Sequence, residues 1–191
     1  MGMIASMQPR YWALAAAIWG FAEATAFFIV PDILLTASIL VGGTIFALRL
    51  AGIAAVAAMV GGLGMYFWSA SDAGAAREMV LAVPLIAPDL IARVATEIDG
   101  AWPVNLFLGA LSGAPYKIYA VEAGASGVNA AAFAVVSVAA RFARFAIAIG
   151  FASAGFTLAN RLGLAKLRAP GLFLVWAAIY AFYMSIRLGA A

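Results

Sequence analysis

Residues 11–48 read YWALAAAIWGFAEATAFFIVPDILLTASILVGGTIFAL, an apolar block that is interrupted near its middle by Glu23 and by the pair Pro31–Asp32. A helix needs about 20 apolar residues to cross a bilayer. The block is therefore too long for one crossing, and it corresponds either to two crossings or to a re-entrant hairpin with two arms. Because proline removes a backbone N–H and breaks a helix, we expect a re-entrant hairpin whose break lies at Pro31.

The composition of the whole chain is typical of a membrane protein. Of its 191 residues, 67% are hydrophobic and only 10% are charged, whereas about a quarter of the residues of a soluble domain are charged. The sequence contains no cysteine and no histidine, which excludes disulfides, thiolate nucleophiles and imidazole bases or metal ligands. The net charge of +3 is too small and too scattered for a nucleic-acid partner. We therefore expect one membrane domain over residues 1–191 that is not an enzyme and that has no cofactor and no metal site.

The second half of the chain repeats the arrangement of the first. Residues 101–128 form another apolar block with Pro115 near its centre, and we expect a second re-entrant hairpin that breaks there. An amphipathic linker at 71–100 joins the two halves, with helix breaks at Pro84 and Pro88. The expected fold is all-α and polytopic, with two re-entrant helical hairpins that are each followed by a transmembrane helix as an inverted repeat, and one further C-terminal transmembrane helix. The expected membrane-crossing segments are 50–70, 129–158 and 171–186.

The charges outside the apolar blocks orient the chain. The linker is acidic, and in the expected topology the basic loops lie on the opposite face of the membrane; their residues are Arg10, Arg49, Arg161, Lys166 and Arg168. The positive-inside rule places these basic loops in the cytoplasm, and we expect an integral protein of a bacterial plasma (inner) membrane. Ala22–Glu23–Ala24 resembles a signal-peptide cleavage site, but the apolar run continues beyond it, so we expect this segment to be retained.

Several charged side chains lie inside the apolar blocks, where each costs about 2.5 to 3.5 kcal/mol on insertion scales unless it is paired or hydrated. They are Glu23, Asp32, Lys117, Glu122, Arg141 and Arg144. The spacing of Arg141 and Arg144 puts both guanidinium groups on one helix face, where they can bind a single phosphate. A simpler interpretation is that the arginines form structural ion pairs with Glu23 and Asp32. The two interpretations are compatible.

Four segments of the chain carry short motifs in a fixed order. They are FAEATAFFIVPDILL at 21–35, GGLGMY at 61–66, a hairpin with Trp102, Pro115–Tyr116–Lys117 and Ala123–Gly124, and RFARF at 141–145. Together they resemble the DedA family, also called SNARE-associated or VTT-domain membrane proteins, in its short bacterial branch. The corresponding family patterns are the signature E-[AS]-x-FF…PPD-x-LL, a G-x-x-x-G-Y helix, a second hairpin W-x…PYK…AAG and an R-x-x-RF helix. The chain departs from the family at Val30, at Ser112–Gly113–Ala114 and in its final helix.

This resemblance implies transport or scrambling of an anionic phospholipid or a polyprenyl phosphate, in support of envelope lipid homeostasis. It implies basic site residues at Arg141 and Arg144 and acidic ones at Glu23 and Asp32. Our hypothesis is that Arg141, Arg144 and Lys117 bind the lipid phosphate, while Glu23 and Asp32 take up protons and couple release to the proton gradient. The implied partners are membrane lipid and protons. The sequence does not distinguish a monomer from a homo-oligomer.

Other functions use the same features. A proton- or cation-coupled transporter of small solutes has similar broken helices and buried charges, but needs a closed polar pocket instead of a lateral opening for acyl chains. A membrane scaffold without a substrate needs only structural ion pairs. Exchanging the two partner residues of such a pair with each other should then restore function. A membrane enzyme is the least favoured alternative, because no matching catalytic signature is present.

Overall fold

The computed structural model describes residues 8–188, with side chains up to residue 185, and these residues form helices and connecting turns without any β-strand. Three helices are long and apolar enough to cross a membrane: Asp32–Ser71, Ala130–Arg161 and Ala165–Ser185. The all-helical prediction is therefore confirmed. The three apolar helices are compatible with an integral membrane protein.

The first helices are separated by a stretch of non-helical backbone. Helix α2 (Pro9–Thr25) begins with a proline, whose fixed φ suits the first turn. The chain leaves the helix at Ala26, and residues 26–31, the first break, lead to α3 (Asp32–Ser71). Pro31 is the residue directly before α3, where its missing N–H removes no helical hydrogen bond.

Helix α3 bends within its first third. Gly43 has φ 77° and ψ 179°, which is outside the helical region. A positive φ is available to glycine at no steric cost because glycine lacks a Cβ. Helix α3 therefore has two arms, residues 32–42 and 44–71, and the bend lies inside the block 11–48.

The linker consists of two short helices, α4 (Ala73–Leu81) and α5 (Pro88–Asp99). Residues 82–87 connect them, and Pro88 occupies the first turn of α5. Helix α5 is amphipathic, because it buries Leu90, Val94 and Ile98 along one face and leaves the charged face exposed.

The second half again has a helix, a break, a second helix and then a long helix. Helix α6 (Trp102–Ser112) ends at Gly113, which adopts the left-handed conformation common after a helix. Residues 113–115 form the second break, and Pro115 directly precedes α7 (Tyr116–Ala125). Helix α8 (Ala130–Arg161) and a short 3-10 turn (Ala165–Leu167) then lead to α9 (Arg168–Leu188).

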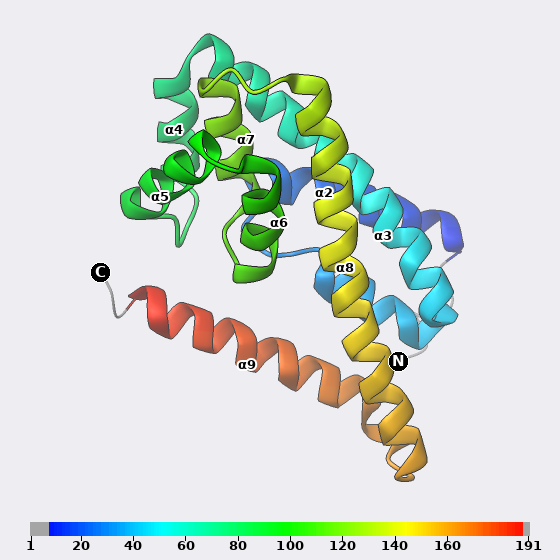
Figure 1. Ribbon diagram of the computed structural model, residues 1–191. Helices are drawn as coiled ribbons and strands as arrows, with labels where there is room; N and C mark the ends of the chain where they lie inside the picture. Colours follow the sequence, from blue (N-terminus) through cyan, green and yellow to red (C-terminus); the bar gives the residue numbers. More distant parts are fainter. Residues whose placement is uncertain (1–7, 189–191) are drawn as a thin grey trace.

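Helix α3 lies at the centre of the molecule, and α2, α7 and α8 pack against it (Figure 1). Small residues permit the closest approaches: a Cβ at Gly124 would lie 2.2 Å from the carbonyl oxygen of Tyr66, and a Cβ at Gly62 would lie 2.2 Å from the hydroxyl of Tyr116. Helix α7 is consequently buried along almost its whole length. Helix α9 instead leaves the end of α8 and runs back across the molecule (Figure 1), with most of its side chains exposed.

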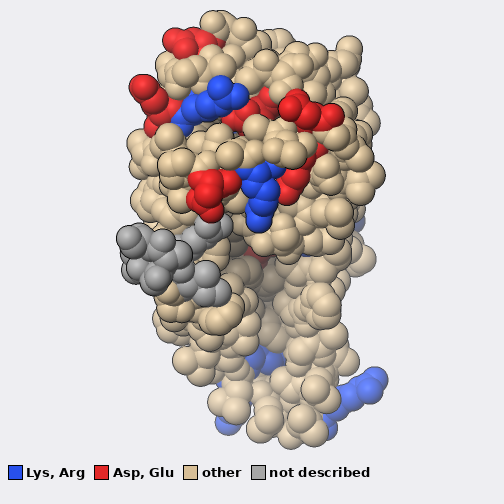
Figure 2. All heavy atoms as spheres, turned by 60° about the vertical axis from the view of Figure 1, so that its left-hand side comes forward, with Lys and Arg blue, Asp and Glu red and all other residues tan. Residues whose placement is uncertain are grey.

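Charge is distributed unevenly between the two ends of the molecule. On the face drawn in Figure 2, acidic side chains gather at the end formed by the linker helices, together with a few basic ones. At the opposite end the charged side chains on this face are all Lys or Arg. There α8 meets α9, and the sequence carries Arg161, Lys166 and Arg168. Between the two ends the surface is hollowed (Figure 2).

Candidate functional site

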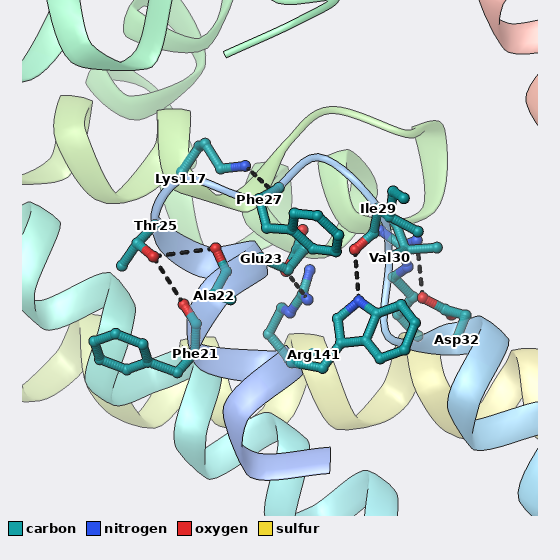
Figure 3. A network of polar contacts seen from close by, with 12 residues as sticks. Phe21, Ala22, Glu23, Thr25, Phe27, Ile29, Val30, Asp32, Lys117 and Arg141 are labelled. Atoms are coloured by element: carbon teal, nitrogen blue, oxygen red, sulfur yellow. Dashed lines mark hydrogen bonds and ion pairs between the residues drawn. The ribbon is translucent and has the colours of Figure 1, made fainter. Parts of the chain in front are cut away.

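An ion pair joins α2 to α8 in the interior. The Arg141 guanidinium donates through Nη2 to Oε2 of Glu23, and the two side chains are only 1% and 5% exposed. Figure 3 shows the two side chains pointing toward each other beneath the loop that carries Phe27. A buried charge is tolerated only when it is paired and hydrogen-bonded, so the pair fixes the end of α2 against the middle of α8.

A second ion pair links α3 to α8 one turn further along. Arg144 donates through Nη2 to Oδ2 of Asp32 at 3.2 Å. The Arg144 side chain is 18% exposed, whereas that of Asp32 is 3% exposed. Asp32 is the first residue of α3, where the positive end of the helix dipole also favours a carboxylate. This pair is longer and more accessible than the Glu23–Arg141 pair.

Lys117 has a different partner. Its Nζ donates to the carbonyl oxygen of Phe27 at 2.8 Å, as Figure 3 shows, and the residue is 1% exposed. Among the described residues, no carboxylate lies within ion-pair distance of Lys117. The cluster of Glu23, Asp32, Lys117, Arg141 and Arg144 therefore contains three basic and two acidic side chains, which leaves one basic side chain without a carboxylate partner.

Side chains satisfy the backbone of the first break. The Trp19 indole donates to the carbonyl oxygen of Ile29 at 2.8 Å, and the Val30 N–H donates to the Tyr180 hydroxyl at 2.9 Å. Lys117 binds the Phe27 carbonyl in the same stretch. Non-helical backbone in an apolar environment requires such partners, so the break is held by residues of α2, α7 and α9.

The Arg141 side chain keeps unused hydrogen-bonding capacity. Its guanidinium carbon lies 5.3 Å from the centre of the Tyr116 ring and 4.8 Å from that of Phe145, within cation–π range. Within the part of the chain that the structure describes, Arg141 Nε and Nη1 have no hydrogen-bond partner. Arg141 is therefore held by one carboxylate and two rings.

A cavity of about 170 Å³ lies beside these charges. Glu23, Lys117 and Arg144 line it, both breaks contribute to its wall through residues such as Val30 and Pro115, and α9 closes one side. The α9 residues are Trp176, Ile179, Tyr180 and Tyr183. Most of the lining is apolar or aromatic, so the cavity combines two basic side chains and one carboxylate with a surface suited to hydrocarbon.

The structure brings five of the six sequence-predicted charges together, and the sixth, Glu122, lies in a separate pair. Each arginine has a carboxylate of its own, as in the structural interpretation. Glu23, Lys117 and Arg144 line the cavity, whereas Arg141 is not among its lining residues. Within residues 8–185, no group of three or more metal-binding side chains is close enough to hold a metal ion.

Sequence reasoning did not identify the contribution of α9. Besides the Tyr180–Val30 hydrogen bond, the Trp176 indole donates to Thr36 Oγ1 at 3.0 Å. The only signal in the sequence is that Trp176 and Tyr180 are four residues apart, and therefore lie on one helix face.

Glu122, another charge inside an apolar block, lies in a separate pair. Arg77 donates to both of its carboxylate oxygens, at 2.8 and 2.6 Å. This hydrogen-bonded contact raises the pKa of Arg77 above its usual value. The pair fastens α4 to α7, and neither residue lines the cavity.

A scan against protein-family models, a search of curated proteins and a search of solved structures each gave no significant match.

Proposed function

We propose that this chain is a DedA-like transporter or scramblase that moves an anionic phospholipid or a polyprenyl phosphate across a bacterial plasma membrane, in support of envelope lipid homeostasis. The observation that carries the proposal is the cavity itself. Lys117 and Arg144 provide positive charge for a phosphate, and the aromatic wall from α9 provides an apolar surface for the rest of the lipid. An amphipathic anion, which has both a charged phosphate and an apolar part, matches both features of the cavity.

The two helix–break–helix units support a transporter architecture. In our proposal α2 with the first arm of α3, and α6 with α7, are re-entrant hairpins that enter from opposite faces and form an inverted repeat. Both breaks line the same cavity, as expected if two hairpin tips meet near the middle of a membrane. The basic end of the molecule would then face the cytoplasm.

The charge balance favours lipid transport over a structural scaffold. Structural ion pairs account for Glu23 with Arg141 and for Asp32 with Arg144. They do not account for Lys117, a buried cation whose described partner is a carbonyl oxygen. An anionic headgroup would neutralise this remaining positive charge. A small polar solute would be a poorer match, because the cavity wall is mainly apolar.

In the proposed mechanism, a lipid phosphate enters beside Lys117 and competes with Asp32 for Arg144. The 3.2 Å pair is the one open to competition, because Arg144 is partly exposed. A proton taken up by Asp32 would neutralise the carboxylate that Arg144 leaves. Loss of that proton would restore the pair and expel the phosphate, which would couple translocation to protons.

The test is translocation of a fluorescent anionic phospholipid, and separately of a polyprenyl phosphate, by purified protein in phosphatidylethanolamine–phosphatidylglycerol vesicles. Arg144→Gln should abolish movement of the transported lipid. Arg93→Gln is the matched control, since it neutralises an arginine that lies outside the cavity and pairs at the surface, and it should retain translocation. The proposal fails if wild-type protein moves neither lipid faster than protein-free vesicles, or if Arg144→Gln behaves like wild type.

A further inference from the structure

We propose that the groove between α8 and α9 holds the hydrocarbon tail of the same lipid whose phosphate lies beside Lys117 and Arg144. This inference rests on the proposed function and specifies how its substrate is bound. It makes α9 part of the lipid site and requires a substrate that has both a long tail and an anionic head.

The groove is a second hollow of about 460 Å³. One wall is α8 between Ala148 and Ala159, and the other is α9 with the turn before it, between Leu167 and Ile179. Apart from Thr36 and Arg168, the lining residues are apolar. Its volume is within the range of about 300 to 1,000 Å³ that is usual for ligand sites. Such a surface fits a hydrocarbon chain and offers little to a polar molecule.

The groove adjoins the charged cavity. Trp176 and Ile179 line both hollows, so in the proposal one molecule places its phosphate on one side of these residues and its tail on the other. The indole of Trp176 is held by its hydrogen bond to Thr36. Trp176 therefore forms the boundary between the place for the head and the place for the tail.

The occupant follows from the charge in the adjoining cavity. Lipid tails are already in hydrocarbon, so entering the groove brings no hydrophobic gain, and the groove can select a tail only by its fit. A tail would remain there in preference to the surrounding lipid when its own head is anchored nearby. The anchor is the pair of cations Lys117 and Arg144, which selects a lipid with an anionic phosphate.

Glycines on α8 provide a matched test. Gly155 lines the groove and Gly150 does not, although both are on α8, and a Cβ at either position would meet no atom within 4 Å. Gly155→Trp should fill the groove and lower the initial translocation rate of a long-tailed anionic lipid by about ten-fold, which corresponds to about 1.4 kcal/mol of activation free energy. Gly150→Trp should leave the rate within about two-fold of wild type.

A second pair of variants probes the opposite wall. Val175 lines the groove from α9, whereas its neighbour Leu174 is not among the lining residues. Val175→Trp should slow translocation and Leu174→Trp should not. If wild-type protein translocates lipid and all four variants match it, the groove proposal is wrong while the proposed function stands. If wild-type protein translocates nothing, the proposed function itself has failed.

Labelling identifies what occupies the groove. A phosphatidylglycerol with a diazirine in its tail should label peptides from both walls of the groove, and Arg144→Gln should reduce that labelling several-fold. Labelling that is equal in Arg144→Gln would indicate ordinary boundary lipid and overturn the proposal. Absence of labelling on both walls of the groove in wild-type protein that translocates lipid would also overturn it.

Discussion

Replacing Glu23 by glutamine should destabilise the protein strongly, because Arg141 would keep its charge in a place where both side chains are almost fully buried. Removing one partner of a buried ion pair costs about 3 to 5 kcal/mol. The rings of Tyr116 and Phe145 beside the guanidinium are present before and after the change, so they do not offset the loss. We expect about 3 kcal/mol or more for Glu23→Gln.

The matched control is Arg93→Gln. Arg93 pairs with Glu97 at 3.5 Å, but the two side chains are 53% and 28% exposed, and such surface pairs contribute at most about 1 kcal/mol. The double variant Glu23→Gln/Arg141→Gln removes both buried charges, and should recover about 1 to 3 kcal/mol relative to the sum of the single variants.

The assay is reversible unfolding in mixed detergent–lipid micelles, with the free energy of unfolding measured for each variant. The reasoning is refuted if Glu23→Gln costs no more than Arg93→Gln. It is equally refuted if the double variant loses the sum of its two single losses, since Glu23 and Arg141 would then act independently.

Two further predictions concern packing and the first break. Gly124→Ala should lower the free energy of unfolding by about 1 to 3 kcal/mol, because the new methyl would collide with the Tyr66 carbonyl 2.2 Å away. Gly64→Ala, where a Cβ meets nothing within 4 Å, should be neutral or stabilising. Equal losses for the two variants in the same unfolding assay would contradict the packing. Tyr180→Phe should lower the free energy of unfolding by about 1 to 3 kcal/mol, because it leaves the Val30 N–H unpaired. It should also speed hydrogen exchange at the Val30 amide. Unchanged exchange there would show that the contact does not hold the break.

The helical architecture could be predicted because the length of an apolar block limits how often it crosses a bilayer, and because a proline interrupts a helix. Pro31 and Pro115 each directly precede a helix and follow a stretch of non-helical backbone. The bend at Gly43 could not be located from the sequence. Its pair of glycines lies in an apolar run that could equally continue as a straight helix.

The cluster of charges could be predicted from the cost of isolated charge in hydrocarbon, whereas its pairing could not. Arg141 and Arg144 lie on the same helix face, so either could have paired with Glu23 or Asp32, and their positions in the fold decide. Lys117 binds a backbone carbonyl, for which a sequence carries no signal. The part played by α9 was missed because an apolar helix does not reveal which of its faces packs against the rest of the protein.

The most direct test of the central claim, that an anionic headgroup is bound by the positive charge of the cavity, is the effect of Lys117→Met on lipid translocation. The chain has one other lysine, Lys166, which is exposed and outside the cavity, so Lys166→Met is a control of identical chemistry. In vesicles with anionic phospholipid, Lys117→Met should lower the initial rate by about ten-fold, equivalent to about 1.4 kcal/mol, while Lys166→Met should match wild type. Equal rates for Lys117→Met and wild type would contradict the account.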